Sequence, residues 1–268
     1  MTNYDEKYDK IDESTAMPFT ARLMAYYRAQ ESQRDNPLII DPHAEKLAGD
    51  LKDYLKDHIR YSQMDYAIVR SYYIEEKLLK IWCEEKKQSQ IVMLGAGLDT
   101  RAYRFKPFKI NDHIVFEIDL PVIIKYKKRI LRDEIPLCKL VQISGKINKC
   151  QWLSKLMNNG FSSEIPSFWI LEGVIFYMEK QYVSVMLEKI ADISAESSQI
   201  FADINIPILS EIKMGPFTRH FKWGLELNEV SSFFKKEGWK VKGSYADNFD
   251  QGRDVGQRGM IFINGKKI

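Results

Sequence analysis

Apolar positions follow two different periods along the chain, and the change falls near residue 90. Before residue 85 they recur at the spacing of a helix. The two apolar stripes consist of Leu47, Leu51 and Leu55, within a helix expected over His43–Leu55, and of Ile74, Leu78, Ile81 and Trp82. Pro37 and Pro42 lie between them and would break a continuous helix. We therefore predict that the chain begins with a helical region.

From residue 90 onward, short apolar runs alternate with segments of helix length. The runs cover residues 91–94, 113–118, 139–143, 168–172 and 199–204. Such strands, separated by helices, predict βαβ units in a parallel sheet that is covered on both faces. The tail differs, because "LNEVSSFFKKEGWKVKGSY" predicts a capped helix and a strand, and "RGMIFING" a further strand after a loop. A short connection implies an antiparallel partner at the end of the sheet.

Composition narrows the class of protein. The chain has 268 residues, 45% hydrophobic and 29% charged, as in soluble globular proteins. Its longest apolar runs are too short for a transmembrane helix, and the charged N-terminus "MTNYDEKYDK" does not resemble a secretory signal. Three cysteines, Cys83, Cys138 and Cys150, form no CxxC pair, which favours the cytoplasm. The net charge of +3 argues against nucleic acid, and we interpret the basic run 125–132 as a solvated helix face.

The strand at 91–94 runs into "GAGLDTR", a glycine turn that precedes a helix. Glycines let the backbone approach a ligand closely, and the first N–H groups of a helix are free to bind it. The third glycine of the dinucleotide fingerprint is missing, and Asp99 would repel a phosphate. The turn therefore favours a ligand without a diphosphate.

An acidic residue at the end of the second strand normally binds ribose hydroxyls. Asp119, in "FEIDLP", follows Gly97 by 22 residues, close to the usual separation of about 20. Glu117 lies on the same face of the strand and is the fallback, and Asp119 could instead stabilise the loop before Pro121. A nucleoside with ribose but no pyrophosphate, on such a sheet, is best matched by S-adenosylmethionine.

Three motifs then resemble a known family. "VMLGAGLDTRAYRF", "FEIDLP" and "ILEGVIFYMEKQ" look like the leucine carboxyl methyltransferase family, most closely its small bacterial branch with polyketide-pathway O-methyltransferases. The similarity covers roughly residues 18–263. It implies an α/β class I methyltransferase (Rossmann-like) fold, with a mostly parallel seven-stranded sheet and an antiparallel C-terminal hairpin. It also implies an N-terminal helical cap over 1–88 and a catalytic domain over 89–268 that binds S-adenosylmethionine and releases S-adenosylhomocysteine.

The resemblance also implies roles for individual residues. Gly95 and Gly97 would approach the methionine moiety, and Glu172 would lie beside that moiety or the sulfonium. Arg70 would hold the methionine carboxylate, with Arg28 as a weaker candidate. The full set implied for the cofactor is Arg28, Arg70, Gly95, Ala96, Gly97, Asp119, Leu120, Ser144 and Glu172.

The sequence departs from the family after the third strand. The family usually has an aspartate there that binds the adenine amino group, whereas this chain has Ser144, Gly145 and Lys146. Ser144 or a backbone carbonyl must then bind adenine. Because one hydrogen bond contributes about 0.5–1.5 kcal/mol, we expect modestly weaker cofactor binding. A binding or scaffold protein that has lost turnover is the alternative.

Candidate acceptor residues follow the fourth and fifth strands. Tyr177 is our preferred acceptor contact, although it could instead pack the following helix. His220 lies in a predicted lid at about 205–225 and is a candidate base, or else a surface or loop-anchoring histidine. Arg219 could pair with an acceptor carboxylate. A carboxylate, with a pKa of about 4, needs no base, whereas a phenol, with a pKa of about 10, benefits from one.

These observations predict an S-adenosylmethionine-dependent O-methyltransferase of secondary metabolism that converts a small-molecule carboxylate into a methyl ester. The alternative acceptor is a phenolic hydroxyl of a polyketide-like metabolite, and a nicotinamide-dependent oxidoreductase is a distant third. We expect no metal site, since no histidine or cysteine spacing resembles one. The expected partner is the acceptor, without nucleic acid or membrane. The acceptor's identity and the oligomeric state stay open.

Overall fold

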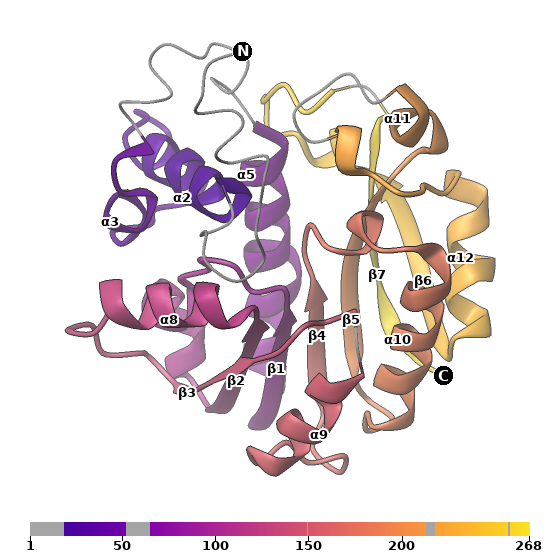
Figure 1. The fold of residues 1–268 in the computed structure, drawn as a ribbon, viewed down its shortest axis with the longest axis horizontal. Helices are drawn as coiled ribbons and strands as arrows, with labels where there is room; N and C mark the ends of the chain where they lie inside the picture. Colours follow the sequence, from indigo (N-terminus) through magenta and orange to yellow (C-terminus); the bar gives the residue numbers. More distant parts are fainter. Residues whose placement is uncertain (1–18, 52–64, 149, 213–217, 257) are drawn as a thin grey trace.

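Seven strands form one sheet in the order β3-β2-β1-β4-β5-β7-β6 (Figure 1). The computed structural model describes residues 19–51, 65–148, 150–212, 218–256 and 258–268. The strands are β1 (Gln88–Leu94), β2 (Asp112–Asp119), β3 (Lys139–Ser144), β4 (Ser167–Leu171), β5 (Gln199–Asn205), β6 (Trp239–Tyr245) and β7 (Met260–Lys267). β1 to β5 pair in parallel, and β7 runs antiparallel between β5 and β6. The predicted parallel sheet with a C-terminal hairpin is confirmed.

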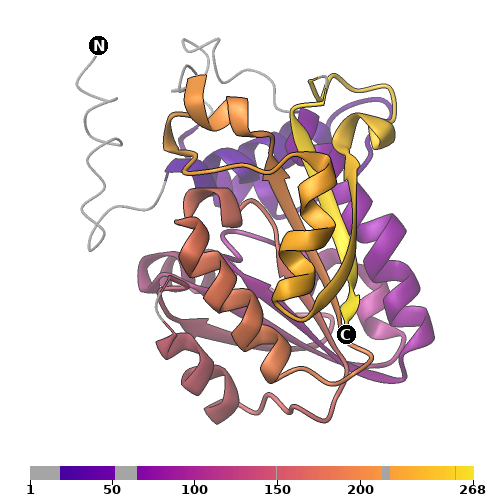
Figure 2. The same cartoon turned by 90° about the vertical axis from the view of Figure 1, so that its right-hand side faces the viewer.

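Helices cover both faces of this sheet (Figures 1 and 2). The α-helices are α2 (Phe19–Glu31), α3 (Ala44–Ala48), α5 (Asp65–Tyr72), α6 (Lys80–Glu85), α7 (Arg101–Arg104), α8 (Pro121–Ile130), α9 (Gln151–Asn158), α10 (Lys180–Asp192), α11 (Pro207–Ile212) and α12 (Leu227–Lys236). A π-helix, η2 (Tyr73–Leu79), joins α5 to α6. The 3-10 turns are η3 (Lys106–Lys109), η4 (Ile175–Tyr177), η5 (Thr218–His220) and η6 (Ala246–Phe249). No helix in these described ranges is long and apolar enough to cross a bilayer.

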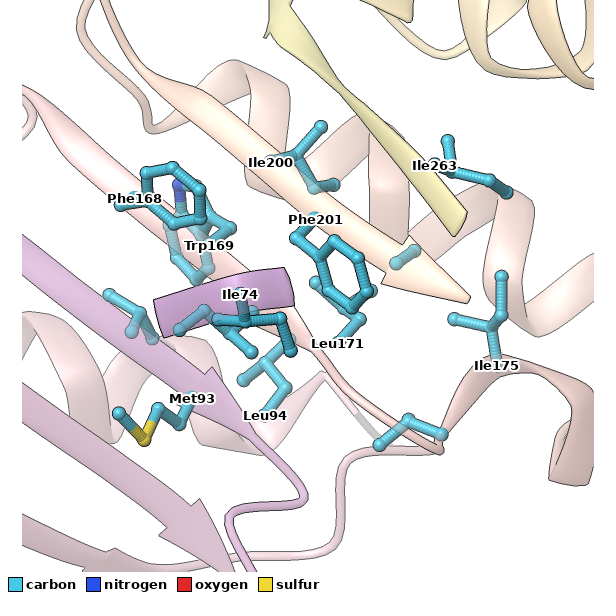
Figure 3. Close-up of a cluster of buried hydrophobic side chains, with 14 of the residues drawn as sticks. Ile74, Met93, Leu94, Phe168, Trp169, Leu171, Ile175, Ile200, Phe201 and Ile263 are labelled. Carbon is cyan, nitrogen blue, oxygen red and sulfur yellow. The ribbon is translucent and has the colours of Figure 1, made fainter. Parts of the chain in front are cut away.

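The core lies on both sides of the central strands because successive side chains of a strand point to opposite faces. In β4, Phe168 meets Trp82 of α6 with ring centroids 5.4 Å apart. The next residue, Trp169, meets Trp152 of α9 at 6.3 Å. Figure 3 shows apolar side chains of β1, β4 and β5 in this core. Helices α5 to α6 therefore pack into the same core as the sheet.

Two predictions for the helical region were wrong in detail. The helix expected over His43–Leu55 ends at Ala48, because Gly49 adopts a left-handed conformation with φ of 63°; residue 55 lies outside the described residues. In the second stripe, Ile81 is 48% exposed although Trp82 is buried. The intervening π-helix has more residues per turn than an α-helix, so a period of 3.6 does not carry through it.

Helices α2 and α3 lie at the upper left of Figure 1 and α11 at the upper right, so all three are at the same end of the sheet. α11 begins two residues after β5 ends, which places this end beyond the carboxyl ends of the parallel strands. Ligands of open α/β sheets bind at this end of the sheet, and the cavity described below lies there.

The basic run 125–132 is only partly a solvated helix face, because Lys127 is fully buried.

Candidate active site

A cavity of about 390 Å³ opens at the carboxyl ends of β1, β2 and β4. This volume falls within the usual range for small-molecule sites. The glycine turn after β1 forms one wall, and α2 and α5 close it from the side of the N-terminal helices. η4, α11, η5 and β7 contribute the remaining wall. The cavity therefore has a charged arm near β1 and an apolar arm near η4.

The glycine turn brings the backbone up to the cavity. Gly95 and Gly97 have φ values of 70° and 54°, which side chains other than glycine rarely adopt. A Cβ on Gly95 would lie 2.7 Å from Val174 Cγ2, so this glycine permits close packing. A Cβ on Gly97 would meet no atom of the described residues within 4 Å and would point into open space. Gly97, together with Ala96, thus offers a place for a ligand against the backbone.

Asp119 closes this turn from the end of β2. Its Oδ2 accepts a hydrogen bond from Gly97 N–H at 2.6 Å, and its Oδ1 accepts one from Leu120 N–H at 2.6 Å. Burial raises the pKa of Asp119, although both hydrogen bonds oppose the shift. The carboxylate lines the cavity, so the structure places it where the sequence predicted. Leu120 itself does not line the cavity, and its predicted contact with the cofactor stays a prediction.

Two other positions predicted near the ribose and adenine lie elsewhere. Glu117, the fallback for Asp119, is fully buried, pairs with Lys127 Nζ at 2.7 Å and does not line the cavity, which favours Asp119 over it. The two-residue period of a strand predicts the face on which Glu117 lies, but not whether its side chain is buried there. Ser144 is paired in register with Asp119 on the neighbouring strand but does not line the cavity. Its carbonyl oxygen accepts a hydrogen bond from Lys155 Nζ at 2.7 Å, and its role toward adenine stays a prediction.

Glu172 follows β4 and lies between the two arms. Its Oε1 accepts hydrogen bonds from Arg70 Nε at 3.1 Å and Ser71 Oγ at 3.0 Å, and its Oε2 accepts one from Arg101 Nη1 at 2.7 Å. Burial by itself would raise the pKa of Glu172, but Arg101 and Arg70, with the hydrogen bonds, hold it at about 2. Glu172 is therefore a carboxylate at neutral pH.

Arg70 and Arg28 are both buried and line the cavity. Arg70 donates through Nη1 to Asp203 Oδ2 at 2.7 Å, in addition to its bond to Glu172. Arg28 donates through Nε to Asp41 at 2.8 Å and through Nη2 to the Leu98 carbonyl at 2.6 Å. Each guanidinium keeps one nitrogen without a protein acceptor among the described residues. Both arginines are therefore placed to receive a ligand carboxylate, as the sequence predicted, and the role stays a prediction.

Ion pairs link these residues into one buried network. From α2 to β5 the chain of pairs runs through Arg28, Asp41, Arg104, Glu75, Arg101, Glu172, Arg70 and Asp203, and Asp99 is a side branch on Arg101. It contains five carboxylates and four arginines, so one carboxylate is in excess within the described residues. Charges removed from water favour a counter-charge strongly. This arm of the cavity therefore suits a ligand with a net positive charge.

The opposite arm is aromatic and aliphatic. Phe176 packs against Tyr177 and Phe221 with ring centroids 4.6 Å apart in each pair. Further cavity-lining side chains on this arm are Tyr66, Leu209, Thr218, Val255 and Met260. Burial raises the pKa of the Tyr177 phenol, so it stays protonated. Such a surface binds a ligand mainly through apolar area and ring contacts.

The structure brings most predicted residues together around the cavity but leaves three, Leu120, Ser144 and His220, outside its lining. Tyr177 lines the cavity. His220 is exposed and does not line it, and its Nε2 lies 2.9 Å from Arg219 Nε. The predicted lid is represented by Leu209, Thr218 and Phe221, while residues 213–217 lie outside the described residues. In the described part of the chain, no three His, Cys, Asp or Glu side chains are grouped to hold a metal ion.

Sequence reasoning missed five charged residues of the network, two of which are Asp41 and Arg104. Arg101, Glu75 and Asp203 have side chains that are almost completely buried. The signal for Asp203 was present, because an acidic residue within the apolar run 199–204 must be paired if that run is a buried strand. Arg101 and Glu75 lack such a signal, since a π-helix and a turn bring them together.

Comparisons with known proteins agree with this geometry. Residues 21–191 match the sequence profile described as leucine carboxyl methyltransferase. A Mycobacteroides abscessus protein, provisionally named an S-adenosyl-L-methionine-dependent methyltransferase, is 27% identical over 92% of this chain and 89% of its own length. A Saccharopolyspora erythraea protein with the same name is 28% identical over 88% of this chain and 87% of its own length.

Solved structures share the fold at low sequence identity. A DUF574 family protein from Streptomyces avermitilis has a TM-score of 0.63 at 11% identity, covering 93% of this chain and 97% of that chain. A Thermobifida fusca protein, provisionally described as a methyltransferase, has a TM-score of 0.61 at 16% identity, covering 96% and 97%. These likenesses confirm the α/β class I methyltransferase fold. With the profile match across most of the chain, they lead to one conclusion: this protein belongs to the leucine carboxyl methyltransferase family.

Proposed function

We propose that the protein is an S-adenosylmethionine-dependent O-methyltransferase that forms the methyl ester of a small-molecule carboxylate. The observation that carries this proposal is the charged arm, where the Gly95–Gly97 turn, Asp119 and Glu172 face one cavity. S-adenosylmethionine has a net charge of +1, which matches the excess carboxylate of the network. The names of the relatives support the same donor.

The residues present fit this donor. The open space above Gly97 would accept the donor against the backbone, and Asp119 would accept hydrogen bonds from ribose hydroxyls. The guanidinium nitrogens of Arg70 or Arg28 that have no acceptor among the described residues would hold the methionine carboxylate. Glu172 would face the cationic part of the donor.

The bound donor would supply an activated methyl group. The protein's own contribution is to align the two reactants and to exclude water, which are the main sources of rate in such a displacement. A carboxylate acceptor is already ionised at neutral pH, so the cavity need not supply a base. The exposed position of His220 is compatible with such a reaction.

A second candidate acceptor is a phenol. The apolar arm, with Phe176, Tyr177 and Phe221, would pack well against an aromatic ring. Among the described residues of this arm, no lysine or arginine lines the cavity, and Arg70 belongs to the charged arm. An acceptor carboxylate would therefore have to keep part of its hydration or share Arg70.

Methyl-labelled S-adenosylmethionine, incubated with the protein and a metabolite extract, tests the proposal. We expect labelled products that release methanol in alkali, because methyl esters hydrolyse there and aryl ethers do not. Label that survives alkali would instead assign the phenolic reaction. Binding of the cofactor without transfer to any acceptor in the extract would favour a protein that has lost turnover.

A further inference from the structure

One oxygen of Glu172 depends on a single side chain. Its Oε1 has two donors, Arg70 and Ser71, whereas its Oε2 has only Arg101 among the described residues. Arg101 Nη1 lies 2.7 Å from that oxygen, and the Arg101 side chain is 1% exposed. Among the described residues, Arg101 is therefore the side chain that fixes the second oxygen of the Glu172 carboxylate.

Arg101 is in turn fixed from two other sides. Its Nε donates to Glu75 Oε1 at 2.9 Å, and its Nη1 also donates to Asp99 Oδ2 at 2.5 Å. Glu75 belongs to the π-helix, a distortion that is frequent at functional sites. Asp99 also accepts a hydrogen bond from the Arg101 backbone N–H at 2.7 Å. A planar guanidinium can join three carboxylates in this fixed arrangement, which a lysine ammonium cannot reproduce.

Arg104 provides a natural comparison within the same helix. It is also buried and also binds Glu75, at 2.6 Å from Nη2 and 2.8 Å from Nη1. Its remaining contacts are with Thr100 Oγ1 at 2.9 Å and Asp41 at 3.8 Å. Arg104 therefore belongs to the same network but makes no contact with Glu172.

We propose that Arg101 is a positioning residue that holds the Glu172 carboxylate toward the cavity, so that the site distinguishes a cationic methyl donor from its uncharged thioether product. This inference rests on the proposed function. The donor carries a sulfonium charge that the product S-adenosylhomocysteine lacks, while both share the adenosine and amino-acid parts. A correctly held carboxylate therefore favours the donor, and a misplaced one loses that preference.

Isothermal titration of S-adenosylmethionine and S-adenosylhomocysteine into Arg101→Lys and Arg104→Lys tests this. In Arg101→Lys we expect donor affinity to fall about tenfold and product affinity by about twofold or less, which changes their ratio. In Arg104→Lys both affinities should change by the same factor. The inference would be overturned if Arg101→Lys left the ratio of the two affinities unchanged, or if Arg104→Lys changed that ratio as much as Arg101→Lys does.

The double variant shows whether Arg101 acts through Glu172. Glu172→Gln should shift the ratio in the same direction, and Arg101→Lys should add nothing in that background. Additive shifts would overturn the inference. If Arg101→Lys does not fold, Glu75→Gln can replace it, because this change loosens Arg101 without altering Glu172. Glu75→Gln should shift the ratio of the two affinities by about threefold, and an unchanged ratio would overturn the inference.

The two proposals fail in different ways. If the wild-type protein binds neither ligand, the proposed function fails and this inference fails with it. If the wild-type protein binds both and the variants leave the ratio unchanged, only the role of Arg101 is refuted.

Discussion

The two arms of the cavity are built on different physical principles. On the charged arm, α2, α5, α7, β5 and the turn after β4 each contribute side chains to one buried chain of ion pairs. On the apolar arm, η4, η5 and β7 contribute rings and aliphatic groups without such pairs. Ion pairs depend strongly on geometry, whereas apolar contact is not directional. The charged arm is thus suited to one constant ligand and the apolar arm to an acceptor of variable shape.

Removing a carboxylate from the charged arm should have the largest effect on stability. Asp203 is fully buried and accepts hydrogen bonds from Tyr66, Arg70 and the Gly173 N–H. Asp203→Ala would leave Arg70 without this partner, which costs about 3–5 kcal/mol of unfolding free energy. Urea unfolding measures this.

The matched control for Asp203→Ala is Asp192→Ala. Asp192 pairs with Lys189 at 3.1 Å on the surface, with 57% of its side chain exposed. This change should lie within about 0.5 kcal/mol of the wild type. Equal losses in the two variants would show that the buried network has no special part in stability.

The pH dependence of stability should reveal the charge on Glu172. Its pKa is about 2 in the folded protein, below the ordinary 4.5. The contribution of the ionised Glu172 to the free energy of unfolding is therefore fully present above pH 4.5 and is lost as the pH falls through 2. The lost contribution is on the order of 3 kcal/mol.

Urea midpoints between pH 7 and pH 2 test this for Glu172. Glu172→Gln should show a shallower loss of stability than the wild type between pH 4.5 and pH 2. Identical slopes for the two proteins would mean that this carboxylate is not held by Arg70 and Arg101 in solution.

The glycine turn beside the charged arm should tolerate its two glycines unequally. Gly95→Ala combines a strained φ with a Cβ placed 2.7 Å from Val174 Cγ2, and should lose about 2–4 kcal/mol of stability. Gly97→Ala has the strained φ but open space, and should lose about 1–2 kcal/mol while weakening donor binding. Thermal unfolding measures the stability of the two variants, and titration with S-adenosylmethionine measures their donor binding. A larger loss of stability for Gly97→Ala than for Gly95→Ala would contradict the packing described here.

The apolar arm should affect only the acceptor. Tyr177→Phe removes one hydroxyl and should lower kcat/KM for the acceptor by about tenfold, with donor affinity unchanged. Tyr182→Phe makes the same change on α10, where the side chain is 49% exposed, and should have no effect. A change in donor affinity for Tyr177→Phe would mean that the two arms are not separate.

Much of the fold could be predicted because its signals are local. The apolar runs gave five parallel strands, and "GAGLDTR" and "FEIDLP" indicated the turn and Asp119. The charged network could not be predicted, because Arg101, Glu75 and Asp203 meet only after distant elements pack. The period of the helix before β1 also failed at Ile81, since a π-helix has no simple apolar signature.

Titration of the wild-type protein with S-adenosylmethionine tests the central claim most directly. The charged arm predicts saturable binding of one equivalent, with a Kd of about 1–100 µM, in the usual range of enzyme substrates. A titration that gives no heat of binding up to about 1 mM S-adenosylmethionine would contradict the account of this cavity as a methyl-donor site.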